Sequence, residues 1–183
     1  MRLLVALVTG LSGLAVTAVA ACRSGDGEAA VQAESRTAAI YAAVITEIAA
    51  DNPPATDRDR SRRPLFVEGA GGYEVPIEVQ VEVVNELKDT EPVRFIDERA
   101  EAVRIADDDE PVRNDGVLIV LHPVAVDEDP VTVTADRYLR LDEVLRHRFT
   151  LELDGDEDVE VVGEPTTTPT TFAPTRRSGR AGG

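Results

Sequence analysis

The sequence is poor in the residues that support disulfides and stacking. It has one cysteine, no tryptophan and three tyrosines. No disulfide can form within the chain, so the fold must be stabilised by packing. The shortage of aromatic residues argues against clefts that bind sugars or single-stranded nucleic acid, because such clefts use aromatic platforms.

Nucleophilic side chains are also scarce. Between residues 36 and 163 the only serine is Ser61, which lies in a charged loop without the Gly-x-Ser-x-Gly pattern of many hydrolases. Thr132, Thr134 and Thr150 fall at alternating positions of expected strands, where we expect them to face solvent. The sequence therefore argues against acyl transfer, and it predicts no catalytic residue and no cofactor.

Positive charge is the third shortage. The chain has 19 Lys and Arg against 35 Asp and Glu, a formal net charge of -16, and Lys88 is its only lysine. Such a surface repels nucleic acid, so we expect no nucleic-acid partner. The lysine shortage is typical of GC-rich, actinobacterial-like genomes, and salt adaptation is the alternative explanation.

The longest uncharged stretch, residues 3–21, follows Arg2 and runs directly into the lone cysteine, Cys22. Three apolar residues precede this cysteine: Val19, Ala20 and Ala21. Small residues there allow an extended backbone to enter a signal-peptidase cleft. The arrangement resembles the lipobox of bacterial lipoproteins. The resemblance implies that residues 1–21 are a signal peptide, that Cys22 carries lipid, and that the lipid anchors the protein to the outer face of the cell membrane.

Two alternatives stay open for this leader. About 20 apolar residues span a bilayer, so the stretch could persist as an uncleaved transmembrane helix, although Gly10 and Gly13 weaken that helix. The small residues around Val19 also fit ordinary secretory cleavage, which would release a soluble protein starting at Ala21. The lone cysteine favours the lipoprotein, because an unpaired thiol is rare in exported proteins.

Composition divides the rest of the chain into three parts. Residues 22–35 are small and polar, which predicts a flexible spacer. Residues 36–163 have the length and apolar content of one acidic globular domain. Residues 164–183 are rich in Thr and Pro, which predicts a disordered tail or an O-glycosylated stalk.

Helical spacing of apolar residues predicts a helix over 36–50, capped by Ser35. Residues 76–89 fit either a strand or a helix, and the acids at 78, 82 and 86 favour a helix whose apolar face includes Ile77, Val81, Val84 and Leu87. Expected strands are 65–67, 93–98, 102–105, 117–121, 131–135, 148–153 and 159–162.

This order of elements predicts an α+β domain, in which an N-terminal helix, and a second one if 76–89 is helical, packs on a curved antiparallel sheet of about four to six strands. The five apolar residues of 117–121 predict a central strand covered on both faces, preceded by a hairpin turn at 114–116. Small exported domains of the cystatin-like, cone-shaped type are broadly similar, but this likeness of fold implies no function.

Two metal sites deserve consideration. His122 and His147 lie at the ends of expected strands and could hold zinc with Asp136 or Glu143. His147 alternates with the apolar residues at 145, 149, 151 and 153, which points it toward the core, and no short-spaced partner supports a site over ordinary packed histidines. Acidic clusters at 107–110, 127–129 and 154–158 supply the oxygen ligands that calcium prefers. They lack the full pattern of a calcium loop, so we expect solvated turns.

The sequence therefore predicts a lipid-anchored, exported envelope protein. Its contacts would be with the membrane, through lipid on Cys22, and with a protein or cell-wall partner. We expect a binding or structural domain rather than an enzyme. The alternative is a small hydrolase, or a calcium- or zinc-dependent module that uses the acidic residues.

Overall fold

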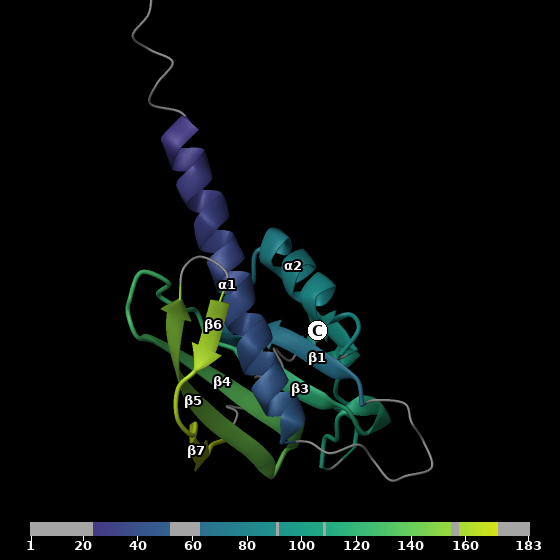
Figure 1. Cartoon of the computed structure of the whole chain (residues 1–183). Helices are drawn as coiled ribbons and strands as arrows, with labels where there is room; N and C mark the ends of the chain where they lie inside the picture. Colours follow the sequence, from purple (N-terminus) through teal and green to yellow (C-terminus); the bar gives the residue numbers. More distant parts are fainter. Residues whose placement is uncertain (1–23, 52–62, 91, 108, 155–157, 172–183) are drawn as a thin grey trace, which may run out of the picture.

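The structure is a computed structural model that describes residues 24–51, 63–90, 92–107, 109–154 and 158–171. Two helices, α1 and α2, pack on one face of a curved sheet with strand order β2-β1-β3-β4-β5-β6, and β7 also pairs with β5 (Figure 1). The elements are α1 (Ser24–Ala50), β1 (Leu65–Gly69), α2 (Ile77–Leu87), β2 (Val93–Phe95), β3 (Val117–Leu121), β4 (Val131–Arg140), β5 (Glu143–Asp154), β6 (Asp158–Val161) and β7 (Thr166–Pro169).

The predicted α+β class, with an N-terminal helix on a curved sheet, is confirmed. From β3 to β6 the strands are antiparallel as expected. Strand β1, in contrast, pairs in parallel with both β2 and β3, so the sheet is mixed. Parallel neighbours need a long crossover connection, and α2 supplies one between β1 and β2.

The first helix is longer than its apolar pattern. It begins at Ser24, so most of the segment 22–35 is helical rather than a flexible spacer, and Ser35 lies inside the helix instead of capping it. Ala and Glu in this segment are good helix formers, which offsets the cost of its glycines. Residues 27–32 are exposed, and Figure 1 shows this half of α1 extending beyond the sheet.

The second helix is confirmed, but its buried face shares only Leu87 with the predicted one. Val79, Val83 and Leu87 are buried. The stripe of Ile77, Val81 and Val84 is exposed. Because α2 has apolar residues on two faces, periodicity alone could not decide which face meets the sheet.

Three local predictions are wrong. Residues 102–105 do not form a strand, and Val103 makes only a single bridge with Val112. The residues at 114–116 form a 3₁₀ turn, with positive φ at Asn114 and Asp115, that leads into β3 rather than a hairpin. In the expected disordered tail, Thr166–Pro169 forms β7 against β5, because the edge of β5 offers unpaired backbone groups.

The sheet separates two apolar clusters. The larger one lies between the sheet and the helices and includes Ile45 and Phe149. The smaller one lies on the opposite face, where Leu118 and Val120 pack against residues of the segment 96–112. All five residues of β3 are buried, so the predicted central strand covered on both faces is confirmed.

Candidate functional site

The predicted lipid site lies outside the described residues. Cys22 and the three residues before it, Val19, Ala20 and Ala21, precede Ser24, where the description begins. Within the described part of the chain, no helix combines the length and apolarity needed to cross a bilayer. The lipid site therefore stays a prediction from sequence.

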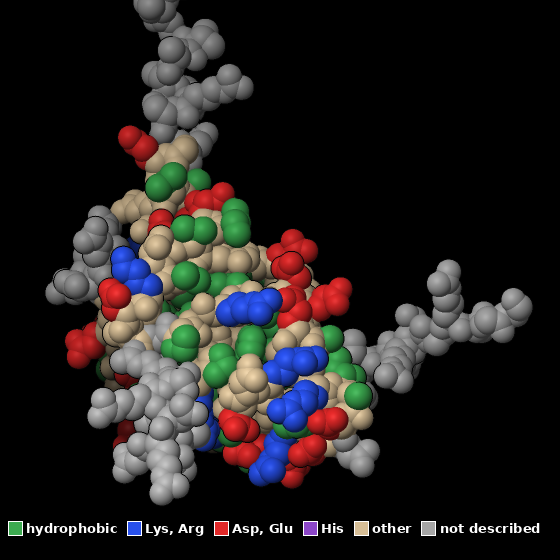
Figure 2. Space-filling view, turned by 90° about the vertical axis from the view of Figure 1, so that its right-hand side faces the viewer, with side chains coloured by type: hydrophobic (Ala, Val, Ile, Leu, Met, Phe, Trp, Pro, Cys, Tyr) green, Lys and Arg blue, Asp and Glu red, His purple; other side chains and the backbone are tan. Residues whose placement is uncertain are grey.

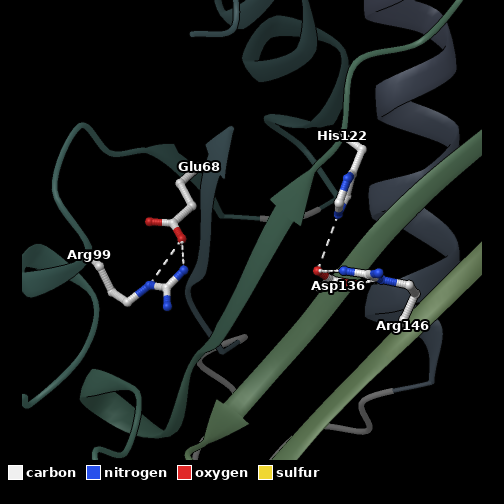
Figure 3. A network of polar contacts seen from close by, with 5 residues as sticks. All are labelled: Glu68, Arg99, His122, Asp136 and Arg146. Atoms are coloured by element: carbon white, nitrogen blue, oxygen red, sulfur yellow. Dashed lines mark hydrogen bonds and ion pairs between the residues drawn. The ribbon is translucent and has the colours of Figure 1, made fainter. Parts of the chain in front are cut away.

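The strongest group of polar side chains lies on the sheet face opposite the helices. Register places four residues side by side across four strands: Glu68, Val120, Asp136 and Arg146. Residues that face each other across neighbouring strands point to the same side of the sheet. Figure 3 shows the polar side chains of this row in front of the strands, with α1 behind them.

Asp136 is the centre of this group. It is buried, with only 2% of its surface exposed. Arg146 on β5 donates two hydrogen bonds to its carboxylate, from Nε at 2.7 Å and from a terminal nitrogen at 2.9 Å. His122, which directly follows β3, places Nε2 at 3.2 Å from the second carboxylate oxygen. A buried carboxylate is tolerated here because both of its oxygens are hydrogen-bonded.

These contacts fix the charge of the site. Burial raises the pKa of Asp136, but the hydrogen bonds from Arg146 and His122 outweigh burial and hold this pKa below its usual value. The same hydrogen bond from Arg146 raises the pKa of the guanidinium. An ionised Asp136 accepts a hydrogen bond from the Nε2–H of His122, which leaves the ring lone pair on Nδ1, where it can accept a further hydrogen bond.

A second ion pair, between Arg99 and Glu68, connects the segment 96–112, which covers part of this sheet face, to β1. Arg99 also lies over the ring of Tyr138, with 5.9 Å from its central carbon to the ring centroid. Burial, followed by the charge of Glu110, raises the pKa of Tyr138 to about 12. Both contacts fasten the segment 96–112 to the sheet, which is a structural role.

The zinc hypothesis fails on geometry. Arg146 shares a face with Asp136, so His147, the next residue, points to the opposite face, beneath α1. His122 and His147 therefore cannot share one ion. Glu143 is 3.3 Å from Arg140 instead. The described ranges contain no group of three or more His, Cys, Asp or Glu placed to hold a metal.

His147 is a buried packed histidine, as its alternation with core residues predicted. Its surface is 2% exposed, and its ring stacks on Phe149 with 6.0 Å between centroids. Thr167 of β7 hydrogen-bonds to Nδ1 at 3.1 Å, whereas Nε2 has no partner among the residues that the structure describes. Burial, followed by the positive charge of Arg137, lowers the pKa of His147.

The acidic clusters are only partly described, because Asp108 and residues 155–157 lie outside the described residues. In the first cluster, Asp107 contacts Arg104 at 3.8 Å. In the second, residues 127–129 are all exposed. Exposure of these acids agrees with solvated turns.

The clefts in the described part of the protein include two that border α2. One of about 590 Å³ lies where β1 turns toward α2 and is lined by Glu68, Tyr73 and Gln80 among others. The other, of about 470 Å³, lies between α1, α2 and β6. Neither cleft includes His122 or Asp136.

Searches found no matching family, curated protein or solved structure for this chain.

Among the described residues, only one half of the sheet face that bears Asp136 is covered, by the segment 96–112. Beyond the segment 96–112, strands β4, β5 and β7 present a row of polar side chains that we name the open sheet face: Thr132, Thr134, Arg146, Arg148, Thr150, Thr166 and Thr168. Five of the seven are exposed, while Thr134 and Arg146 are half-buried. Solvent exposure of Thr132 and Thr150 confirms the prediction for these threonines.

Proposed function

We propose that this protein is an exported lipoprotein of the cell envelope, held on the outer face of the cell membrane by lipid on Cys22. The observation that carries this proposal is the lipobox-like run Val19-Ala20-Ala21-Cys22 after an uncharged leader. One acyl chain gives only marginal binding, so stable anchoring requires two chains on the modified cysteine.

The start of α1 supports this proposal. Ser24 begins the helix two positions after Cys22, and the helix reaches the sheet only beyond its exposed residues 27–32. At about 1.5 Å per residue, the nine positions from 24 to 32 add a rigid stem of about 14 Å. Such a stem would keep the acidic domain away from anionic headgroups that repel it.

The domain itself is best described as a binding or structural module. The pair of His122 and Asp136 is the arrangement that most favours the second candidate, a hydrolase, because a carboxylate that orients a histidine is common in general base catalysis. This pair lines neither of the two clefts described above, and enclosed clefts are where substrates usually bind. The geometry therefore favours binding over catalysis.

Substitution of Cys22 tests the anchor. We expect Cys22→Ala to abolish lipid attachment and to move the protein out of the membrane fraction or leave its leader uncleaved, whereas Thr17→Ala, also in the leader, should leave processing unchanged. Mass spectrometry of the wild-type protein and fractionation of both variants provide the measurement. A wild-type chain that begins at Met1 or at Ala21, or that carries an unmodified thiol, would refute the proposal.

A further inference from the structure

We propose that the open sheet face binds a phosphodiester-linked polymer of the cell envelope through Arg146 and Arg148. This inference rests on the proposed location outside the membrane, where such a polymer would meet the protein. It names the partner class that the module would bind. The supporting observations are the spacing of two guanidinium groups, their surrounding hydroxyls and the local charge.

The two arginines are two positions apart on β5, so their side chains share a face of the sheet. Strand geometry separates their Cα atoms by about 7 Å. Thr168 lies opposite Arg146, and Thr166 lies opposite Arg148. On the other side of β5, Thr134 also faces Arg148. Arg148 therefore lies between two threonines, and Arg146 lies between Thr168 and Asp136. Threonine hydroxyls can both donate and accept hydrogen bonds.

Both arginines have donors to spare. Arg146 uses two of its five N–H groups on Asp136, whose carboxylate is buried beneath it. Arg148 is exposed, and its side chain makes no ion pair or hydrogen bond with the described residues. Guanidinium groups hydrogen-bond to phosphate oxygens in a two-pronged geometry, so this pair can contact two successive phosphates.

The acidity of the whole chain does not prevent local attraction. At physiological ionic strength, charges separated by more than about 8 Å are largely screened. Along β5, the nearest acid on the same face after Asp136 is Glu152, four positions beyond Arg148, or about 13 Å away. Asp136 compensates the charge of Arg146, so a ligand on the open sheet face experiences the uncompensated charge of Arg148 more strongly than the net charge of -16.

The shape of the face favours a polymer over a small molecule. Small ligands need a concave pocket, and neither cleft includes a residue of the open sheet face. Threonine hydroxyls suit the hydroxyls of a polyol or sugar that links successive phosphates. The face has no aromatic side chain on which bases could stack, which argues against single-stranded nucleic acid.

Calorimetry with the detergent-solubilised full chain tests this proposal, using poly(glycerol phosphate) as the probe. We expect Arg148→Glu to raise the Kd about tenfold or more, and to lower the slope of log K against log salt by about one. Lys88→Glu is the matched control, because it makes the same change in net charge at the exposed end of α2. The control should change the Kd less than about twofold.

Three results would overturn the proposal: equal losses in the two variants, equal binding of the carboxylate polymer polygalacturonate, or tighter binding of a single-stranded oligonucleotide with the same number of phosphates. These measurements are made in solution and do not depend on the lipid. Failure here with a lipidated Cys22 would reject the ligand alone, and an unmodified Cys22 would reject the anchor alone.

Discussion

At the scale of single residues, alternation along β5 decides the roles of Arg146 and His147. The alternation was visible in the sequence, and it correctly predicted that His147 points toward the core. The bridge between Arg146 and Asp136 was not predicted, because it depends on the register of β5 against β4. The chain has 35 acidic residues, and composition alone does not indicate that Asp136 is buried.

Replacement of Asp136 tests the buried ion pair. We expect Asp136→Asn to lower the free energy of unfolding by about 2 kcal/mol at pH 7, because Arg146 and His122 lose a charged acceptor. Since the pKa of Asp136 is lowered in the fold, its contribution is complete above the ordinary carboxyl range and is lost as the pH falls through the lowered value.

Urea unfolding between pH 7 and pH 2 provides the measurement. The difference between the wild type and Asp136→Asn should shrink only below about pH 4. Asp142→Asn is the control, because the side chain of Asp142 is 81% exposed. A difference between wild type and Asp136→Asn that stays constant down to pH 2 would contradict the role of the charge.

His147 should make the fold sensitive to mild acid. Its pKa is lowered in the fold, so the stability that it contributes is complete above about pH 6.5 and falls as the unfolded chain takes up the proton. Arg137 opposes protonation, while Asp51 and Asp136 favour it. We expect His147→Leu to reduce the loss of melting temperature between pH 7 and pH 5. An unchanged loss in this variant would show that other groups cause the acid sensitivity.

At the scale of elements, α1 combines a buried half and an exposed half. Tyr41 joins the buried half to the end of β3, because its hydroxyl donates a hydrogen bond to the carbonyl of His122 at 3.1 Å. The sequence predicted only the half with an apolar stripe. The exposed half has no such stripe, so its helicity comes from intrinsic propensity and from continuity with the docked half.

The two halves should respond differently to loss of an apolar side chain. We expect Ile45→Ala to lower the free energy of unfolding by about 2–5 kcal/mol, because Ile45 of α1 is fully buried between this helix and the sheet. Val31→Ala should change it by less than about 0.5 kcal/mol, because Val31 is 63% exposed. Chemical denaturation of both variants measures the difference. Equal losses of stability in the two variants would mean that the exposed half of α1 packs against another part of the protein.

At the scale of the whole molecule, the dominant property is the net charge of -16. Like charges on one domain repel each other and destabilise the compact state. The folded domain carries both signs on its surface, as Figure 2 shows for one face, where Lys and Arg gather next to Asp and Glu. These local pairs relieve only part of the repulsion, because acids outnumber bases almost two to one.

Salt should therefore stabilise this protein. We expect the melting temperature to rise by a few degrees between about 0.02 M and 0.5 M NaCl, because screening weakens the repulsion. Thermal melts in CaCl₂ and MgCl₂ of equal ionic strength provide the control. Equal shifts would indicate general screening, and a clearly larger shift in calcium would support the calcium-dependent alternative instead.

The sequence by itself determined the α+β class, the docked half of α1 and the antiparallel half of the sheet, and it favoured a helix over a strand at 76–89, because these follow from local periodicity. It also contains the whole case for lipid on Cys22, since a signal is recognised in an extended chain. Only the tertiary structure decided the parallel pairing of β1, the buried face of α2, the strand at Thr166–Pro169 and the bridge at Asp136. Each of these features depends on which segments distant in the sequence come into contact, and the local pattern of residues does not determine the energy of such long-range pairing.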